Sequence, residues 1–366
     1  MCNNINSDKL SSYKRKKERR ILFYSSVNHK DLFVVTGFYS TDISILQNLG
    51  FKVTLSNSFK DFFKFWQYDI AFIYFWTKGL VPAFISKIFN KKVIFTGGID
   101  NIDREFNKSE LRYKIRKNIF RLCTLFSNAN IIVSMSDLKN IKKTGYKIKN
   151  LYLLPHVIDF ERYAYDNTPK KNIISTVVWM ENKGNVTRKG VDKLLYVFRE
   201  YLNLKQDLTI QIIGTIGEGT DYLRSIAKEL NIENRIIFTG RINEENKIKY
   251  LKESKYYFQL SEYEGFGIAA IEALASGNIV IHSGKGGLAD TIGSFGIIVE
   301  NVEDYKNIAL KLDEINRNYE KYFDLISRGI KHVKDNFSYN IRKEKINNLM
   351  NSLFDNSKKI IGFEQY

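Results

Sequence analysis

The chain has 366 residues, a length that allows two domains, and its 44% hydrophobic and 14% aromatic content supplies enough apolar surface for two cores. Its two cysteines, Cys2 and Cys123, are too few for a disulfide-rich secreted fold, so a reducing, cytoplasmic compartment is expected. The polar and then basic N-terminal segment lacks the apolar stretch of a signal peptide.

The positive charge is concentrated in the first part of the chain. Of the net charge of +17, residues 1–150 account for +16, with 27 Lys and Arg against 11 Asp and Glu, whereas residues 151–366 hold 30 against 29. This asymmetry predicts that one half of the protein faces a polyanion: a nucleic acid, an anionic membrane surface or an acidic substrate. A generally basic proteome is the alternative explanation, but it does not account for the asymmetry.

Strands and helices alternate through the first half. In the first βαβ unit, Ile43, Leu46 and Leu49 have helical spacing, and Gly37 falls in the turn before them, where a backbone can approach a ligand. Residues 70–89 contain only two charged residues, but Lys78, Gly79 and Pro82 predict a strand, a turn and a helix instead of a membrane span. The expected strands of this half are 19–26, 51–55, 69–77, 92–96 and 129–134, and residues 151–159 are expected to form its last strand and a turn.

Residues 109–126 are predicted to form an amphipathic helix. Its apolar stripe consists of Leu111, Ile115, Ile119, Leu122 and Phe126. Its basic face consists of Arg112, Lys114, Arg116, Lys117 and Arg121. A basic amphipathic helix of this kind predicts contact with an anionic membrane surface. A helix that packs its stripe on the core and leaves its basic face in solvent fits the pattern equally well.

A polar segment at 165–172 marks a domain boundary, after which the βα alternation restarts. The whole pattern predicts an α/β protein with two doubly wound parallel sheets. The strands expected in this half are 173–179, 208–214, 235–240, 256–260, 278–282 and 295–299. Residues 303–354 are expected to be helical, with a break near Phe337.

The stretch 261–277 combines two carboxylates with a glycine-rich loop and a helix. Glu264 lies in the loop with Gly265 and Gly267, and Glu272 lies in the helix that follows. The free N–H groups and the dipole of a helix N-terminus bind anions, and carboxylates on either side suit sugar hydroxyls. The stretch is therefore a candidate phosphate and sugar site, although an ordinary loop and helix with one Glu each is the simpler interpretation.

Several motifs occur in a characteristic order, and with them the chain resembles the retaining glycosyltransferases of family 4, which have the GT-B fold. The matching segments are 188–190, 212–214, 238–240, 261–267, 271–277 and 286–290. The resemblance implies two Rossmann-like domains that face each other across a cleft. Residues 1–166 would be the acceptor-side domain, residues 167–340 the nucleotide-sugar-binding domain, and residues 341–366 a C-terminal helix packing back on the first domain.

The resemblance also implies roles for individual residues. Glu272 would bind the ribose hydroxyls, Glu264 the hydroxyls of the donor sugar, and Lys189 the diphosphate. Relatives carry an arginine at the end of the preceding strand, but here that strand ends in Trp179-Met-Glu, and Arg188 is the candidate replacement. The implied donor-binding residues are Gly37, Arg188, Lys189, Gly214, Arg241, Ile242, Glu264, Gly265, Phe266, Gly267, Ile268 and Glu272.

Asp100 and Glu264 are the candidate catalytic residues. Asp100 follows Gly97 and Gly98 at a strand end where relatives have a histidine, and it would orient or deprotonate the acceptor hydroxyl. A loop-stabilising role for Asp100, or its replacement by Asp103, remains open. The resemblance implies no metal and no cofactor beyond the UDP- or GDP-linked sugar. The sequence has neither a His/Cys cluster nor an Asp-x-Asp motif.

These observations predict an enzyme that transfers a sugar to a glycan or lipid-linked acceptor in bacterial surface polysaccharide synthesis. We expect it in the cytoplasm, bound peripherally to the inner face of the cell membrane. A catalytically silent sugar-nucleotide-binding subunit is one alternative. A nucleic-acid-binding protein that uses the basic first half is another, although the sequence has no RNA-binding signature and we expect no nucleic acid partner.

Overall fold

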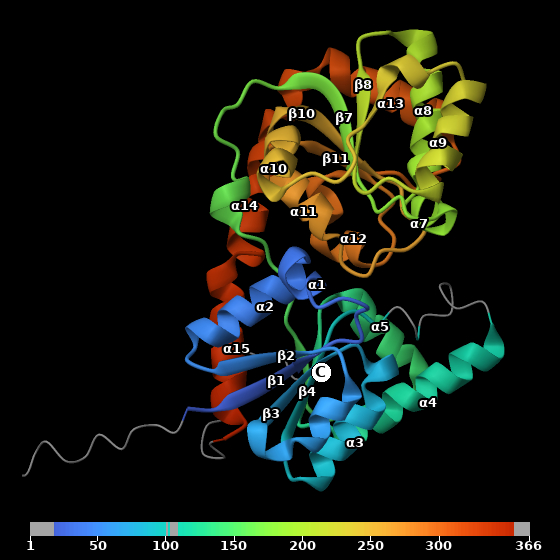
Figure 1. Ribbon diagram of the computed structural model, residues 1–366. Coiled ribbons are helices and arrows are strands. Elements are labelled where there is room, and N and C mark those ends of the chain that lie inside the picture. The colour runs from blue at the N-terminus through green and yellow to red at the C-terminus, as the bar shows by residue number, and fades with distance from the viewer. Residues whose placement is uncertain (1–17, 100–101, 103–108, 355–366) are drawn as a thin grey trace, which may run out of the picture.

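The structure is a computed structural model that describes residues 18–99, 102 and 109–354. It consists of two α/β domains stacked on each other, with the C-terminal helices running along one side of both (Figure 1). Each domain is built on a six-stranded parallel sheet, and helices cover both faces of each sheet. The two doubly wound domains expected from the sequence are confirmed.

The first sheet has the strand order β2-β1-β3-β4-β5-β6. Its central strands are almost entirely apolar and buried on both faces, as parallel strands under two helical layers require. The strands are β1 (Arg20–Tyr24), β2 (Lys52–Ser56), β3 (Ile70–Tyr74), β4 (Lys92–Thr96), β5 (Ala129–Ile132) and β6 (Leu151–Leu153). The helices are α1 (Leu32–Val35), α2 (Gly37–Asn48), η2 (Phe59–Phe63), η3 (Phe65–Gln67), η4 (Trp76–Lys78), α3 (Leu80–Ile88), α4 (Glu110–Phe126) and α5 (Met135–Thr144).

Two expectations for this domain are settled by these bounds. Residues 70–89 form β3, η4 and α3, as predicted, and within the described residues no helix has the length and hydropathy of a membrane span. The helix predicted from Ile43 begins six residues earlier, so Gly37 is the first residue of α2 and not part of a turn. The buried Tyr39 precedes Ile43 by four residues and so continues the same helical face, and the prediction began the helix too late by leaving it out.

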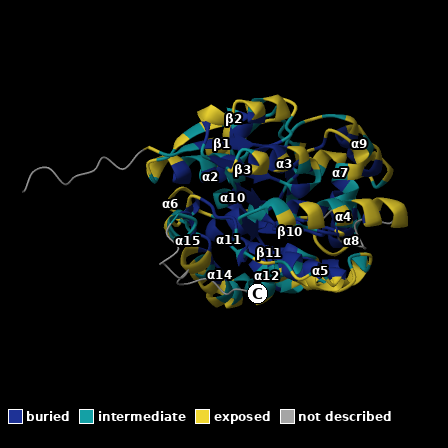
Figure 2. Ribbon diagram, turned by 90° about the horizontal axis from the view of Figure 1, so that it is seen from below, coloured by how far each residue is buried: buried dark blue, intermediate teal, exposed yellow. Residues whose placement is uncertain are grey.

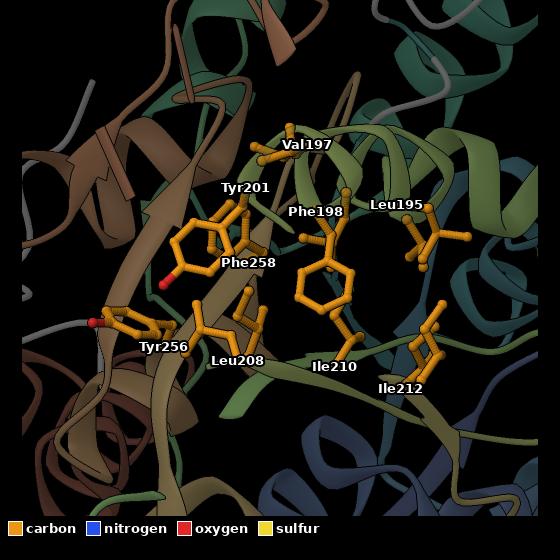
Figure 3. Close-up of a cluster of buried hydrophobic side chains, with 14 of the residues drawn as sticks. Leu195, Val197, Phe198, Tyr201, Leu208, Ile210, Ile212, Tyr256 and Phe258 are labelled. Carbon is orange, nitrogen blue, oxygen red and sulfur yellow. The ribbon is translucent and has the colours of Figure 1, made fainter. Parts of the chain in front are cut away.

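The second sheet has the strand order β12-β11-β10-β7-β8-β9. Its core lies between the sheet and α8, where Phe198 and Leu195 face Ile210 and Ile212 (Figure 3). The strands are β7 (Lys171–Val177), β8 (Thr209–Ile213), β9 (Ile236–Phe238), β10 (Ser254–Gln259), β11 (Ile279–His282) and β12 (Ile297–Ile298). The helices are α7 (Lys183–Arg188), α8 (Val191–Leu204), α9 (Glu218–Glu229), η6 (Glu233–Arg235), α10 (Glu244–Glu253), α11 (Ile268–Ala275), α12 (Gly287–Thr291), η7 (Gly293–Phe295), α13 (Tyr305–Arg317), η8 (Tyr319–Tyr322) and α14 (Phe323–Asn336).

Two chain segments cross between the domains. The short helix α6 (Phe160–Tyr163) precedes the predicted boundary at residue 166, but it packs on α11 of the second domain, so the boundary falls earlier than predicted. The large side chains of Phe160 and Tyr163 are buried against α11. The polar segment 165–172, from which the boundary was predicted, carries no information about this packing. Helix α15 (Tyr339–Ser352) returns to the first domain and buries Ile346 and Leu349 in its core.

Helix α4 is oriented differently from the sequence expectation. It buries Tyr113, Phe120 and Cys123 against the first domain, whereas Leu111 and Ile115 of the predicted stripe are 69% and 50% exposed. Leu122 is also exposed, and Ile119 and Phe126 are only partly buried. The two apolar sets are interleaved on the helix, so the periodicity could not show which of them faces the core.

Candidate active site

The topology places a crevice at the edge of each sheet that faces the other domain. In open parallel sheets, ligands bind at the carboxyl ends of the strands where the strand order reverses. That point lies between β1 and β3 in the first sheet and between β7 and β10 in the second. The glycine-rich loop with Glu264 directly follows β10 and leads into α11, so it lies at the second of these points.

Backbone packing between two glycine loops shapes the turn before α11. Gly267 caps α11 with φ +93°, and Gly286 begins α12 with φ +59°, both in the left-handed region that favours glycine. A Cβ on Gly286 would overlap the carbonyl oxygen of Glu264, and the Gly287 N–H donates to that same oxygen at 2.6 Å. Thr291 holds the loop from the other side by donating to the carbonyl of Phe266 at 2.9 Å.

Glu264 points into a polar cluster at the base of this loop. Its carboxylate is in an ion pair with Lys189, and Gln259 donates to the same carboxylate oxygen at 2.7 Å. The side chains of Lys189 and Glu264 are 19% and 14% exposed, so the pair is accessible from the cleft yet largely shielded. The next residue, Gly190, has φ +67° and lies so close to the Leu260 carbonyl that no side chain would fit there. This close approach brings the backbone at Lys189 next to the end of β10, from which the Glu264 loop begins.

Glu272 lies deeper, one turn into α11, and is 7% exposed. Lys247 of α10 donates to its Oε1 at 3.0 Å and also contacts Glu244 at 3.1 Å. Burial raises the pKa of Glu272, and the positive charge of Lys247 opposes this shift. Burial acts to lower the pKa of Lys247, but the two glutamates raise it overall, so Lys247 is positively charged near neutral pH.

The two carboxylates belong to one electrostatic environment. The buried hydroxyl of Tyr257 on β10 donates to Gln259 Oε1 at 3.1 Å. Burial raises the pKa of Tyr257, and the negative charges of Glu272 and Glu264 raise it further. Tyr257 therefore lies near both carboxylates, of which Glu264 belongs to the loop before α11 and Glu272 to the helix itself.

The remaining predicted donor residues of the second domain come from several of its loops and helices. Arg188 ends α7 and donates to the Tyr263 carbonyl at 3.3 Å, next to Glu264. Gly214 follows β8, where a Cβ would overlap the Val178 carbonyl. Arg241 and Ile242 directly precede α10, the helix that brings Lys247 to Glu272. Gly265 and Ile268 flank the cap residue of α11.

Aromatic rings connect this site to the first domain. Phe38, next to Gly37 at the start of α2, lies 5.3 Å from the ring of His156, and His156 lies 5.4 Å from the ring of Phe266. The Phe266 side chain therefore belongs to the contact between the domains, and its carbonyl accepts from Thr291 of α12. No atom comes within 4 Å of a Cβ built on Gly37, so the space directly beside this glycine is open.

Hydrogen bonds also join the two domains. The N–H of Ser136, at the start of α5, donates to Asp290 of α12 at 2.7 Å. Asn140 donates to the Tyr263 hydroxyl at 3.2 Å. These contacts hold the loop ends of the two sheets together, so groups from both domains can act on one bound molecule.

The acceptor side is described only in part. Asp100 and its rival Asp103 lie outside the described residues. The neighbouring Gly98 and Ile99 line a shallow hollow at the ends of β3 and β4, together with Trp76, Phe120 and Arg116. Arg116, predicted as a membrane contact, thus extends along the inner side of α4. Among the described residues, no group of three or more His, Cys, Asp and Glu could hold a metal ion.

Sequence reasoning missed three polar residues of the site: Gln259, Lys247 and Tyr163. Tyr163, which hydrogen-bonds Glu244 and lies near Glu272, comes from the crossing segment, and Lys247 comes from a helix with no motif. Gln259 is the last residue of the mostly apolar strand β10. A polar amide at such a buried position needs a hydrogen-bond partner, and this was the one feature of the sequence that could have indicated its role.

Comparisons with known proteins identify chains of similar sequence. Residues 182–332 match the family model of glycosyl transferases group 1. An uncharacterized glycosyltransferase of Methanocaldococcus jannaschii is 27% identical over 165 residues, which are 44% of this chain but only 41% of that protein. The alpha-1,3/1,6-mannosyltransferase ALG2 of Dictyostelium discoideum is 23% identical over 396 residues, 95% of this chain and 92% of that protein.

The fold is shared with solved structures. Anabaena HepE, crystallised with UDP and glucose, superposes with a TM-score of 0.74 over 92% of this chain and 100% of that chain, at 15% identity. An identity this low shows the fold alone. The two-domain arrangement is therefore that of the GT-B fold.

Proposed function

This chain is a group 1 glycosyltransferase with the GT-B fold, and we propose that it is a retaining enzyme of family 4 that uses a UDP- or GDP-linked sugar. The acceptor is a glycan or a lipid-linked glycan, and the product is part of a bacterial surface polysaccharide made at the inner face of the cell membrane. The supporting observation is that the loop and helix after β10 carry two carboxylates, Glu264 and Glu272, each paired with a lysine.

In this proposal the nucleoside diphosphate lies across the α11 N-terminus. Glu272 accepts hydrogen bonds from the ribose hydroxyls with an oxygen that Lys247 leaves available. Lys189 leaves Glu264 and binds the diphosphate instead. Arg188 supplies the second positive charge, which relatives provide with an arginine at the end of the preceding strand. Fixed positive charges and N–H groups then stabilise the negative charge that develops on the leaving diphosphate.

Glu264, once released from Lys189, takes the hydroxyls of the donor sugar. Gln259 keeps this carboxylate in place because it donates to it without carrying a charge. The acceptor approaches from the first domain, where the hollow beside Gly98 and Arg116 lies at the carboxyl ends of β3 and β4. Asp100 would orient or deprotonate the attacking hydroxyl there.

Nucleotide binding to a Glu272→Gln variant tests the donor site. We expect UDP or GDP to raise the melting temperature of the wild-type protein, because a ligand of the folded state stabilises it by mass action. Loss of a charged acceptor should weaken that nucleotide about tenfold or more. The matched control is Glu245→Gln, an exposed glutamate on α10. Equal nucleotide affinity in wild type and Glu272→Gln would contradict the assignment.

The stereochemistry is tested on the sugar that the enzyme releases by slow donor hydrolysis. With UDP-glucose and GDP-mannose as probes, proton NMR of the first product shows whether the anomer matches the donor. The donor's anomer is the expected result, and the opposite anomer would refute retention. Donor binding without hydrolysis or transfer would instead support a silent sugar-nucleotide-binding subunit.

A further inference from the structure

We propose that the first domain docks on anionic lipid through one mixed apolar and basic face formed by η2, η3, α3 and α4. We call it the docking face. Eleven of the twenty large hydrophobic side chains that are exposed among the described residues lie in these elements or directly beside them. They are Phe59, Phe63, Phe65, Trp66, Val81, Phe84, Ile88, Leu111, Ile115, Leu122 and Leu125.

The exposed side chains of α4 form a continuous stripe. Leu111, Ile115, Leu122 and Leu125 follow the 3.6-residue helical period along the outer side of the helix. Leu111 and Leu125, near the two ends, are 69% and 67% exposed, so the stripe projects over the full length of the helix. The core needs only the opposite side of α4, and burial within this domain therefore does not explain the stripe.

The stripes of neighbouring elements join into one face. Val81, Phe84 and Ile88 line the outer side of α3, and the ring of Phe84 lies 5.6 Å from the ring of Phe126 on α4. On the other side of α3, Phe65 of η3 stacks on Phe89 at 4.0 Å. Helices α3 and α4 lie side by side in both views, and Figure 2 shows exposed turns on each.

Basic residues border this apolar surface. Helix α4 carries five basic residues against one acidic residue, Glu110. The other elements also contribute exposed lysines: Lys60 in η2, Lys64 between η2 and η3, and Lys87 in α3. Basic side chains at the level of lipid headgroups attract anionic lipid, while apolar side chains beside them enter the acyl boundary. Charge alone would fit a nucleic acid equally well, but eleven exposed apolar side chains favour a lipid surface.

The docking face gives α4 two roles. Its outer side carries the lipid-binding stripe, and Arg116 on its inner side lines the hollow at the ends of β3 and β4. A lipid-linked acceptor held at the bilayer surface would therefore meet the protein beside the cleft. This step rests on the proposed function, whereas the docking face itself does not need it.

Vesicle sedimentation of the full chain tests the docking face. The probes are vesicles of phosphatidylcholine alone and vesicles in which about a third of the lipid is phosphatidylglycerol. The apolar variant is Ile115→Ser/Leu122→Ser/Leu125→Ser, and the charge variant is Arg112→Gln/Lys114→Gln. The matched control, Leu204→Ser/Leu310→Ser/Phe323→Ser, removes three exposed apolar side chains from the second domain.

We expect the wild-type protein to bind anionic vesicles preferentially. The apolar variant should bind them about tenfold more weakly or worse. The charge variant should lose about fivefold per charge, with weaker salt dependence. The control should bind like the wild type. Equal binding of neutral and anionic vesicles, or an apolar variant that binds like the wild type, would overturn the proposal. So would a DNA or RNA duplex that binds instead of vesicles.

A second measurement does not depend on these variants. Trp66 is 60% exposed on the docking face, and Trp179 is the exposed tryptophan of the second domain. In a Trp179→Phe background, brominated phosphatidylglycerol vesicles should quench the fluorescence of Trp66. Absence of quenching would refute the insertion of this face. Melting shifts with UDP and GDP are measured on the same samples, so failure of the donor site and failure of docking are distinguished.

Discussion

The buried ion pair between Arg342 and Asp42 fastens the C-terminal helix α15 to the first domain, and Arg342→Met tests its contribution. Arg342 is 1% exposed and donates to both oxygens of Asp42, at 2.6 and 2.8 Å. It also donates to the carbonyls of Leu154 and Pro155, at 2.6 and 2.8 Å, where the chain leaves the first sheet. The substitution leaves Asp42 as an uncompensated buried charge.

Breaking a buried pair in this way costs about 3–5 kcal/mol of unfolding free energy. For domains of this size, each kcal/mol lowers the melting temperature by about 2–4 °C. We therefore expect the transition of the first domain to fall by roughly 6–20 °C. Differential scanning calorimetry is the assay, because it can resolve the transitions of two domains.

Two variants control for the loss of the side chain itself. Arg328→Met breaks an exposed pair with Asp324 on α14. It should lower the free energy of unfolding by about 0.5 kcal/mol or less, so the melting temperature should change little. Asp42→Asn/Arg342→Met removes both buried charges and should be more stable than Arg342→Met alone. A single variant that melts like the wild type, or a double variant less stable than the single one, would refute the reasoning.

Two further predictions concern His156, in the segment after β6, and Gly286, in the loop before α12. Burial, reinforced by the positive charge of Arg342, lowers the pKa of His156 to about 3. Because the unfolded chain binds a proton near pH 6.5, stability should fall as the pH drops from about 6.5 to about 3, by up to ~1.4 kcal/mol per unit. His156→Phe should flatten this part of a stability–pH curve, and an unchanged slope would contradict the assignment. Gly286→Ala should abolish the nucleotide-induced melting shift, because its Cβ would overlap the Glu264 carbonyl. Gly293→Ala, where φ is +46° but nothing lies within 4 Å of the Cβ, should cost only about 1 kcal/mol and keep the shift.

The fold and part of the donor site could be predicted from the sequence because their signals are local. Alternating apolar strands and helices indicated two doubly wound sheets, and the loop and helix at 261–277 indicated a phosphate and sugar site. Lys189 followed from a short motif before a helix. These features depend on residues close together in the chain, so their spacing carries the information.

The partners of the site residues could not be predicted in the same way. Gln259, Lys247 and Tyr163 reach the two carboxylates from a strand, a helix and a crossing segment that carry no motif. Their proximity depends on how the sheet edges meet, and spacing along the chain does not report it.

The amino-acid sequence by itself determined the class of fold, the position of the two carboxylates around a helix N-terminus and the location of the excess positive charge. Only the tertiary structure decided which side of α4 faces the core and which side is exposed, because Tyr113 with Phe120 and Leu111 with Leu122 both have helical spacing, on opposite faces. It also decided that Asp42 and Arg342, 300 residues apart, form one buried pair. Packing selects among faces and partners that a one-dimensional pattern leaves equivalent.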